Sequence, residues 1–508
     1  MFSGRPLLLA ALFAPATLCA AVTPEIQAVA QKHWFAVRTA HFNIFSCGPN
    51  EEVSRLADRL EQFHDAYFLL AGAQAVSSPP VVVLAFPDRH DMEPFLPLYQ
   101  GKPANMDAFF RHGNDENLIV LALMNLEGRT LQTIFHEYSH LLFRNNEQIW
   151  PIWLCEGMAE IYGTFELVGY EARVGKRIEN HVQVLRSDTW MPLQELFSVK
   201  HDSAQYNEAE RQGVFYSESW LLTHYLMLGP SSFRKSQFGR LTALLKEGQN
   251  PEQAFTNTFH CSLSAMEAEL HRYFDEGRFP YLPYRLKYDL SVPHAGATRP
   301  VSTAETYFRF GDELMRIDRL DAATACFTDV LRIAPKNPLA HEGLGLLAAV
   351  RENHQEAIRE LQESLNLGST SYLAHYVFAF EKFGLATDDR GHQRQSDTNA
   401  SAEIRAELEK SIKLMPTFAP SHGLLGLVDL MDGRDLVGAA KHLQKAVELD
   451  SANYWYQLQL GQAQYLSHDN DAARRTLQSL RMPYVEPRLR KSAEEILAAI
   501  NRGGDAGK

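Results

Sequence analysis

The chain has 508 residues, of which 45% are hydrophobic and 22% are charged. This composition is typical of globular proteins, and the length favours roughly two to four domains. Collagen-like and wholly disordered chains are excluded. The 49 basic and 62 acidic side chains give a net charge of −13, which argues against nucleic acid or an anionic membrane surface as a broad electrostatic partner.

Residues 1–21 have the pattern of a signal peptide. Arg5 supplies a positive start, residues 7–18 form an apolar stretch, and small residues follow, so that cleavage after Ala20 or Ala21 is expected. The apolar stretch is shorter than the roughly 20 residues that a membrane-spanning helix needs. The expectation is an exported protein, periplasmic or secreted, without a membrane span.

The cysteines indicate neither a disulfide framework nor a thiolate metal site. Cys19 would be the acylation site of a lipoprotein, but Leu18 stands where such a signal has a small residue, which disfavours that alternative. The other four are far apart and lack C-x-x-C spacing, which favours buried thiols, although an oxidising compartment would allow one bridge. They are Cys47, Cys155, Cys261 and Cys326.

Residues 22–285 predict one mixed α+β domain. Apolar residues at helical spacing predict a helix over residues 52–70, and nearly every segment from residue 129 to residue 274 has helical periodicity. Short runs rich in β-branched and aromatic residues predict strands. These runs are residues 41–46, 81–84 and 117–121.

Beyond a predicted linker over residues 286–302, the chain repeats itself. Gly311 and Gly345 are 34 residues apart, and larger apolar residues recur at a fixed offset after such small ones. The pattern resembles the tetratricopeptide repeat over residues 303–483, with a loop insertion at 390–402. An irregular helical bundle is the alternative. Residues 484–508 are expected to form a C-terminal helix and tail.

A His-Glu-x-x-His motif is the main candidate for chemistry. His136 and His140 share one face of a predicted helix, so both imidazoles can face one metal ion. Glu137 lies beside them and could take a proton from metal-bound water. The motif is short enough to occur by chance, so its interpretation depends on further residues.

Glu156 provides such a further residue. It lies in Trp-Leu-Cys-Glu-Gly-Met-Ala-Glu, and a turn after the first helix would let a second helix run back past it. Glu156 would then be the third ligand beside His136 and His140. Two imidazoles and one carboxylate leave the fourth position of Zn²⁺ to water, which is the arrangement of a catalytic site.

The two motifs together resemble those of the gluzincin metallopeptidases, and the attached repeats resemble bacterial proteins with a peptidase MA-like domain. The resemblance covers about residues 35–280. It implies a zincin-like fold, Zn²⁺ held by His136, His140 and Glu156, Glu137 as general base, and residues 117–121 as the edge strand that binds a peptide. No Gly-x-Met-Glu-Asn segment is present, which favours endopeptidase over aminopeptidase activity.

A tyrosine is the candidate for stabilising the oxyanion. Tyr216 lies 60 residues after Glu156 at the start of an apolar helix. Its position is similar to that of the tyrosine that zinc aminopeptidases use as oxyanion donor. Tyr206 is a second candidate, and a purely packing role for Tyr216 is the alternative.

Other polar residues allow two interpretations each. Glu160, one turn after Glu156, either accepts a hydrogen bond from a ligand imidazole or is an ordinary helix acid. The remaining histidines of the first domain lack paired spacing, which indicates structural or surface roles. They are His33, His41, His64, His90 and His112.

The sequence as a whole predicts an exported zinc peptidase in which Glu137 activates metal-bound water and the repeats recruit a protein substrate or partner. The alternative is a protein-binding scaffold whose zincin domain is catalytically idle. All four residues of the predicted centre are present, which favours the peptidase.

Overall fold

The structure of the protein is a computed structural model. The chain divides into two compact units, one of residues 1–32 and 302–370 and the other of residues 33–301 and 371–508. The predicted signal peptide up to Ala20, as well as Tyr206, lies outside the described residues. The described residues are 21–72, 81–113, 115–126, 128–145, 150–200, 203, 209–230, 232–247, 249–287, 290, 296, 298–386, 398–482 and 485–505.

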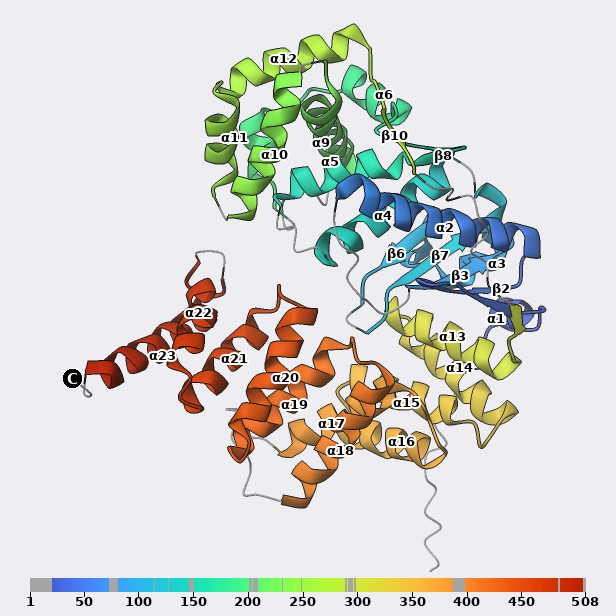
Figure 1. The fold of residues 1–508 in the computed structure, drawn as a ribbon. Helices are drawn as coiled ribbons and strands as arrows, with labels where there is room; N and C mark the ends of the chain where they lie inside the picture. The colour runs from blue at the N-terminus through green and yellow to red at the C-terminus, as the bar shows by residue number, and fades with distance from the viewer. Residues whose placement is uncertain are drawn as a thin grey trace, which may run out of the picture. The chain divides into compact units, whose positions relative to one another are not determined.

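A six-stranded mixed sheet forms the centre of the N-terminal α/β region (Figure 1). The strand order is β11-β1-β2-β3-β7-β6, with β2, β3 and β7 parallel to one another. Strands β3 and β7 are buried along their whole length, as their continuous apolar runs require. The strands are β1 (Phe35–Arg38), β2 (Phe42–Ser46), β3 (Val81–Phe86), β6 (Ala108–Arg111), β7 (Leu118–Ala122) and β11 (Thr298–Pro300).

Two expectations about this sheet are wrong. The strand expected at residues 117–121 is β7, which lies between β3 and β6, so it is not the edge strand. The edge strand on this side of the sheet is β6, a short and partly exposed strand that follows a segment rich in turn residues, where the sequence gives little signal. The segment predicted as a linker also takes part in the fold, because β11 pairs antiparallel with β1.

Helices α2 (Asn50–Ala71) and α4 (Arg129–Asn145) pack against this sheet (Figure 1). Every apolar position that predicted α2 in its first four turns is buried, including Leu56, Leu60 and Phe63. Smaller elements follow β3 and β7: α3 (Arg89–Met92), η1 (Glu93–Phe95), β4 (Leu98–Tyr99), β5 (Lys102–Pro103) and η2 (Leu123–Asn125).

A helical layer follows α4 in the chain. Helices α5 and α9 pack on each other, and α6 packs on α9. A three-stranded antiparallel sheet, in the order β10-β9-β8, joins the start of this layer to its end. Its elements are α5 (Ile152–Gly163), β8 (Glu166–Val168), β9 (Glu171–Val174), α6 (Glu179–Ser187), α7 (Leu193–Ser198), α9 (Ala209–Leu228), α10 (Ser232–Lys246), α11 (Pro251–Phe259), α12 (Leu263–Glu276) and β10 (Leu282–Arg285).

The repeats form stacked pairs of helices in both units. In the first unit, α1 (Pro24–Ala30) packs on the first repeat helix. The helices there are α13 (Thr303–Arg316), α14 (Leu320–Ile333), α15 (Pro338–Val350) and α16 (His354–Asn366). Those of the second unit are α17 (Tyr372–Ala386), α18 (Thr398–Leu414), α19 (Ala419–Asp432), α20 (Leu436–Leu449), α21 (Tyr454–Leu466), α22 (Asn470–Gln478), η3 (Ser479–Arg481) and α23 (Pro487–Asp505).

Glycines at the recurring small positions of the repeats lie where the two helices of a pair touch. A Cβ at any of these glycines would overlap with a large side chain of the next helix, so only glycine allows the approach. This confirms the small-to-large pattern. The contacts are Gly311 with Phe327, Gly345 with Leu361, Gly426 with Leu443 and Gly461 with Leu477.

The predicted insertion at residues 390–402 needs one correction. Helix α18 begins at Thr398, so the last part of that segment belongs to a repeat helix. Residues 387–397 lie outside the described residues. Among the helices of the described part of the chain, none is long and apolar enough to cross a membrane.

Candidate metal centre

Two glycines allow the helices of the candidate centre to approach closely. A Cβ at Gly163, the last residue of α5, would lie 3.1 Å from the Gln132 carbonyl oxygen and 3.4 Å from the Cβ of His136. A Cβ at Gly157 would overlap with Ser219 and Thr223 of α9. Helix α5 therefore lies between α4 and α9 at contact distance, with its buried face against both.

The structure brings His136, His140 and Glu156 together. The Nε2 atoms of the two histidines are 3.2 Å apart, and each lies 3.3 Å from Oε2 of Glu156. All three ligand atoms fall within 4.8 Å of one another, so they could hold one metal ion. Glu156 is 3% exposed, which leaves its carboxylate little solvent to replace a missing partner.

The electrostatics of this group show how tightly its charges are coupled. Burial alone lowers the pKa of His136, but Glu160, Glu156 and Glu137 together raise that pKa to about 9. Burial raises the pKa of Glu156, whereas hydrogen bonds and charge from the two histidines lower it to about 2. In the absence of a metal the group therefore favours a proton on His136 and an ionised Glu156, and a bound cation would replace that proton.

Glu160 contacts the far side of the first histidine. Its Oε1 lies 3.4 Å from Nδ1 of His136, the nitrogen that does not face the other two members of the group. Its Oε2 lies 3.1 Å from Nε2 of His181 in α6. Burial raises the pKa of Glu160, but His136 and His181 lower it below its usual range. Glu160 is therefore a buried acid beside the imidazole of His136 and not an exposed helix residue.

His181 is the member of this cluster that the sequence did not reveal. It is buried, and its partner Glu160 lies 21 residues earlier, on a different helix. No local spacing links a single histidine in α6 to an acid in α5. Only the tertiary packing of α5, α6 and α9 identifies it.

The predicted catalytic residues lie beside the group. Glu137 is partly exposed on α4, and its charge contributes to the raised pKa of His136. Tyr216 is in α9, with its ring centroid 6.2 Å from that of His136. The structure thus brings Tyr216 to the centre, from 80 residues along the chain.

The other histidines of the first domain have structural contacts or exposed positions. His41 Nδ1 lies 2.7 Å from Oε2 of Glu61, and its ring stacks on His64, whose Nδ1 lies 2.8 Å from the Tyr138 hydroxyl. The ring of His112 packs on Phe110. These contacts agree with the structural roles expected for them.

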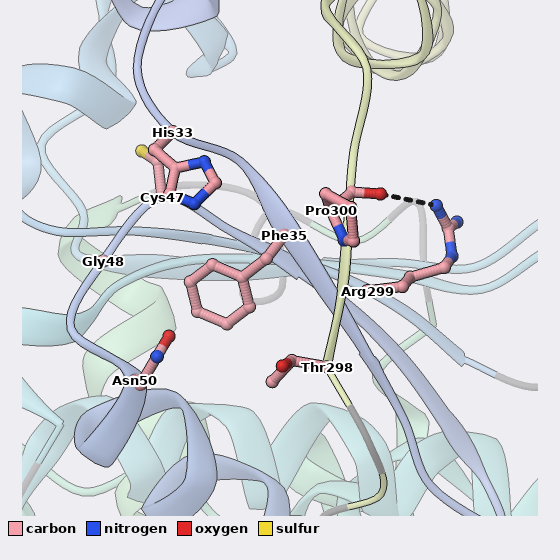
Figure 2. Close-up of a pocket in the computed structure, with 8 residues that line it drawn as sticks. All are labelled: His33, Phe35, Cys47, Gly48, Asn50, Thr298, Arg299 and Pro300. Atoms are coloured by element: carbon pink, nitrogen blue, oxygen red, sulfur yellow. Dashed lines mark hydrogen bonds between the residues drawn. The ribbon is translucent and has the colours of Figure 1, made fainter.

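The larger cavities of the described part of the chain lie outside the His-His-Glu group. One, of about 440 Å³, is lined by His33, Cys47 and Asn50 on one side and by residues 298–300 of β11 on the other (Figure 2). The other, of about 850 Å³, lies at the start of α4 and is lined by Arg55, Arg59 and others. Neither contains a member of the His-His-Glu group.

No protein-family model matches the chain, and no curated protein matches it. Solved structures of tetratricopeptide-repeat proteins do match it. YrrB, a TPR protein with an unusual peptide-binding site, is 16% identical over 38% of this chain and 92% of its own, with a TM-score of 0.32. PilF of Pseudomonas aeruginosa is 16% identical over 39% and 88%, with a TM-score of 0.30. A thermophilic TPR protein of Thermus thermophilus is 20% identical over 38% and 99%, with a TM-score of 0.28.

The chain therefore combines an N-terminal α/β region, which contains a His-His-Glu group, with a stacked-helix region of the tetratricopeptide type. The assignment of the repeats rests on the helix pairs and on the glycines at their contacts. The assignment of the group rests on its geometry.

Proposed function

We propose that the N-terminal α/β region is a zinc-dependent peptidase, with endopeptidase activity favoured over aminopeptidase activity. The observation that carries this proposal is the convergence of His136, His140 and Glu156, whose ligand atoms lie within 4.8 Å of one another. Two imidazoles and one carboxylate match the donor set of catalytic zinc sites, which leave one position open. The second contact of His136, to Glu160, is typical of such sites as well.

When bound, Zn²⁺ would supply Lewis acidity to the scissile carbonyl and to the attacking water. Glu137, partly exposed beside His136, would accept the proton of that water and pass it to the leaving amine. Tyr216, beside His136, would donate its hydroxyl proton in a hydrogen bond to the developing oxyanion. Glu160 would hold the ring of His136 in one orientation.

The repeats would recruit a protein substrate or partner, because stacked helix pairs present extended surfaces to other chains. An exported location, periplasmic or secreted, is part of the proposal and rests on the first 21 residues of the sequence. Deletion of residues 303–508 would test recruitment. Cleavage of short peptides should persist, whereas cleavage of a protein target should weaken.

Metal analysis and digestion of a peptide library, performed on one sample of purified protein, test the peptidase directly. We expect one zinc per chain and cleavage at internal peptide bonds. Glu137→Gln should abolish cleavage but retain zinc, because the amide is nearly isosteric and cannot accept the proton. Absence of bound zinc, even after zinc is added, would refute the peptidase and leave an idle domain in a binding scaffold.

A further inference from the structure

A chain of buried polar contacts continues outward from Glu160. His181 is 8% exposed and links two helices: its Nε2 lies 3.1 Å from Glu160 of α5, and its Nδ1 lies 3.0 Å from the Ser217 hydroxyl of α9. Ser217 is fully buried. The contacts therefore join α4, α5, α6 and α9 in one line that starts at a metal-ligating residue.

The donors in this line can be assigned. The Ser217 hydroxyl donates to the Gly213 carbonyl at 2.7 Å, so its oxygen is available to accept from Nδ1 of His181. The Nε2 of His181 faces a carboxylate oxygen, which can only accept while it is ionised. Both ring nitrogens thus face oxygen atoms, Nδ1 that of the Ser217 hydroxyl and Nε2 one of the Glu160 carboxylate.

We propose that His181 is a positioning residue of the metal centre: it fixes Glu160, and through Glu160 the ring of His136. A carboxylate that contacts a ligand imidazole with one oxygen holds that ring only if its own rotation is restrained. Within the described contacts, Oε2 of Glu160 is restrained by His181. This inference rests on the proposed metal site.

His181 also contacts the helical turn that carries Tyr216, the residue proposed as oxyanion donor. Ser217 is the next residue after Tyr216 on α9, so the His181–Ser217 hydrogen bond restrains the helical turn that carries Tyr216. His181 therefore couples the orientation of a ligand on α4 to the position of a hydroxyl on α9. A substitution at His181 should disturb both, although His181 itself lies behind Glu160.

Metal affinity and a spectroscopic signature test this role in the full-length protein. Zn²⁺ affinity is measured by competition with a chelator, and the visible spectrum of the Co²⁺-substituted protein reports ligand geometry. His181→Leu should weaken Zn²⁺ binding by roughly 10–100-fold and change the Co²⁺ spectrum, the scale for losing an outer partner of a ligand. His181→Gln should restore most of the affinity, because its amide can donate to Glu160.

His224 offers a matched control. It is fully buried on α9, and its ring contacts the Gly175 carbonyl oxygen and the Tyr273 hydroxyl, both at 2.9 Å, and neither of these is in the metal centre. His224→Leu should lower the melting temperature but leave Zn²⁺ affinity and the Co²⁺ spectrum unchanged.

Three results would overturn the inference. Wild-type affinity and an unchanged Co²⁺ spectrum in His181→Leu would show that His181 positions nothing. Equal losses of affinity in His181→Leu and His224→Leu would show a merely structural role. If His181→Leu does not fold, a His181→Gln protein whose Zn²⁺ affinity is still lowered by roughly 10–100-fold would also overturn it, because its amide can donate to Glu160 and should restore the affinity. A wild-type protein that binds no metal would instead refute the proposed function itself.

Discussion

Paired ionisable side chains are arranged differently in the two regions of this protein. In the repeats, they pair with close neighbours: Arg316 with Asp312 one turn away, and His341 with Glu360 on the next helix. In the α/β region, His136, Glu156 and His181 converge from three separate helices. The repeat contacts follow from the period of the sequence, whereas the convergent cluster requires the complete tertiary fold.

The difference has an energetic meaning. Local pairs in the repeats cost little, because partly exposed ion pairs contribute only about 0–1 kcal/mol and can be exchanged without loss of the fold. A buried cluster of carboxylates and imidazoles costs more to desolvate, and such clusters are found preferentially at functional sites. The first contrast to test is therefore whether the cluster binds metal.

Glu156→Ala should produce the largest effect. Two imidazoles alone hold zinc poorly, so Zn²⁺ affinity should fall by more than the roughly 10–100-fold expected for a change outside the ligand set. Chelator competition measures the loss. Hydrolysis should disappear with the metal.

Glu61 provides the matched control for that substitution. Like Glu156, it is a buried carboxylate beside a histidine, with His41 at 2.7 Å, and hydrogen bonds from His41 and Thr39 lower its pKa to about 2 despite burial. Glu61→Ala should destabilise the fold yet bind Zn²⁺ normally. Equal loss of zinc in both variants would show that the effect of Glu156→Ala is structural.

The contrast between local and convergent contacts also explains which residues of the centre could be predicted from the sequence. His136 and His140 lie on one helix, so their spacing alone placed both rings on one face. Glu160 is one turn from Glu156, which made its proximity to the centre predictable. His181 has no such relation to the motif. Its role depends on how α6 packs on α9, which no local pattern encodes.

The neighbours of each strand in the sheet could not be predicted from the sequence either, whereas the helix contacts within the repeats could. The apolar run of β7 predicted a strand but not its neighbours, so its place inside the sheet was missed, and β6 and β11 are too short to give a pattern. In the repeats, the two helices of a pair are neighbours in the chain, so the spacing of small residues accounts for the contacts of Gly345 and Gly426. Contacts between helices that are close in the chain can be predicted from the repeat period of the sequence, whereas the pairing of distant strands cannot.

Tyr216→Phe separates catalysis from packing within the cluster. If Tyr216 stabilises the oxyanion, kcat should fall by roughly 10²–10³ with zinc content unchanged. Tyr225→Phe, on the same helix, is the control: its hydroxyl donates to Glu269 at 2.6 Å, outside the centre, and kcat should be retained. Normal turnover in Tyr216→Phe would remove this residue from the mechanism and leave it a packing role beside His136.

The pH dependence of stability should reveal His224, a buried histidine that lies outside both the His-His-Glu cluster and the repeats. Burial lowers the pKa of His224 from its ordinary 6.5 to about 4. His224 is therefore protonated below about pH 6.5 in the unfolded chain, but only below about pH 4 in the folded protein. His224 thus contributes stability that is complete above pH 6.5 and is lost as the pH falls, by about 3 kcal/mol in all.

Chemical denaturation between pH 7 and pH 4 measures this contribution. His224→Gln keeps a side chain that can donate to the Gly175 carbonyl but cannot take up a proton, so its stability should fall less steeply over that range. Parallel pH profiles of the wild type and His224→Gln would contradict the assignment.

The smallest effects should come from glycines in the repeats, and they should have opposite signs. A Cβ at Gly426 would lie 2.6 Å from Cγ of the buried Leu443 and 3.1 Å from the Ala439 carbonyl oxygen, so Gly426→Ala should lower the free energy of unfolding by about 1–3 kcal/mol. Gly384 lies exposed in α17 with no atom within 4 Å of such a Cβ, so Gly384→Ala should raise it by about 0.5–1 kcal/mol. Denaturant titration measures both changes, and Zn²⁺ affinity should remain that of the wild type in each. If Gly426→Ala were stabilising too, the small residues of the repeats would not be needed for close helix contacts. The repeating sequence pattern would then not explain the repeat contacts, and the comparison with the convergent cluster would fail.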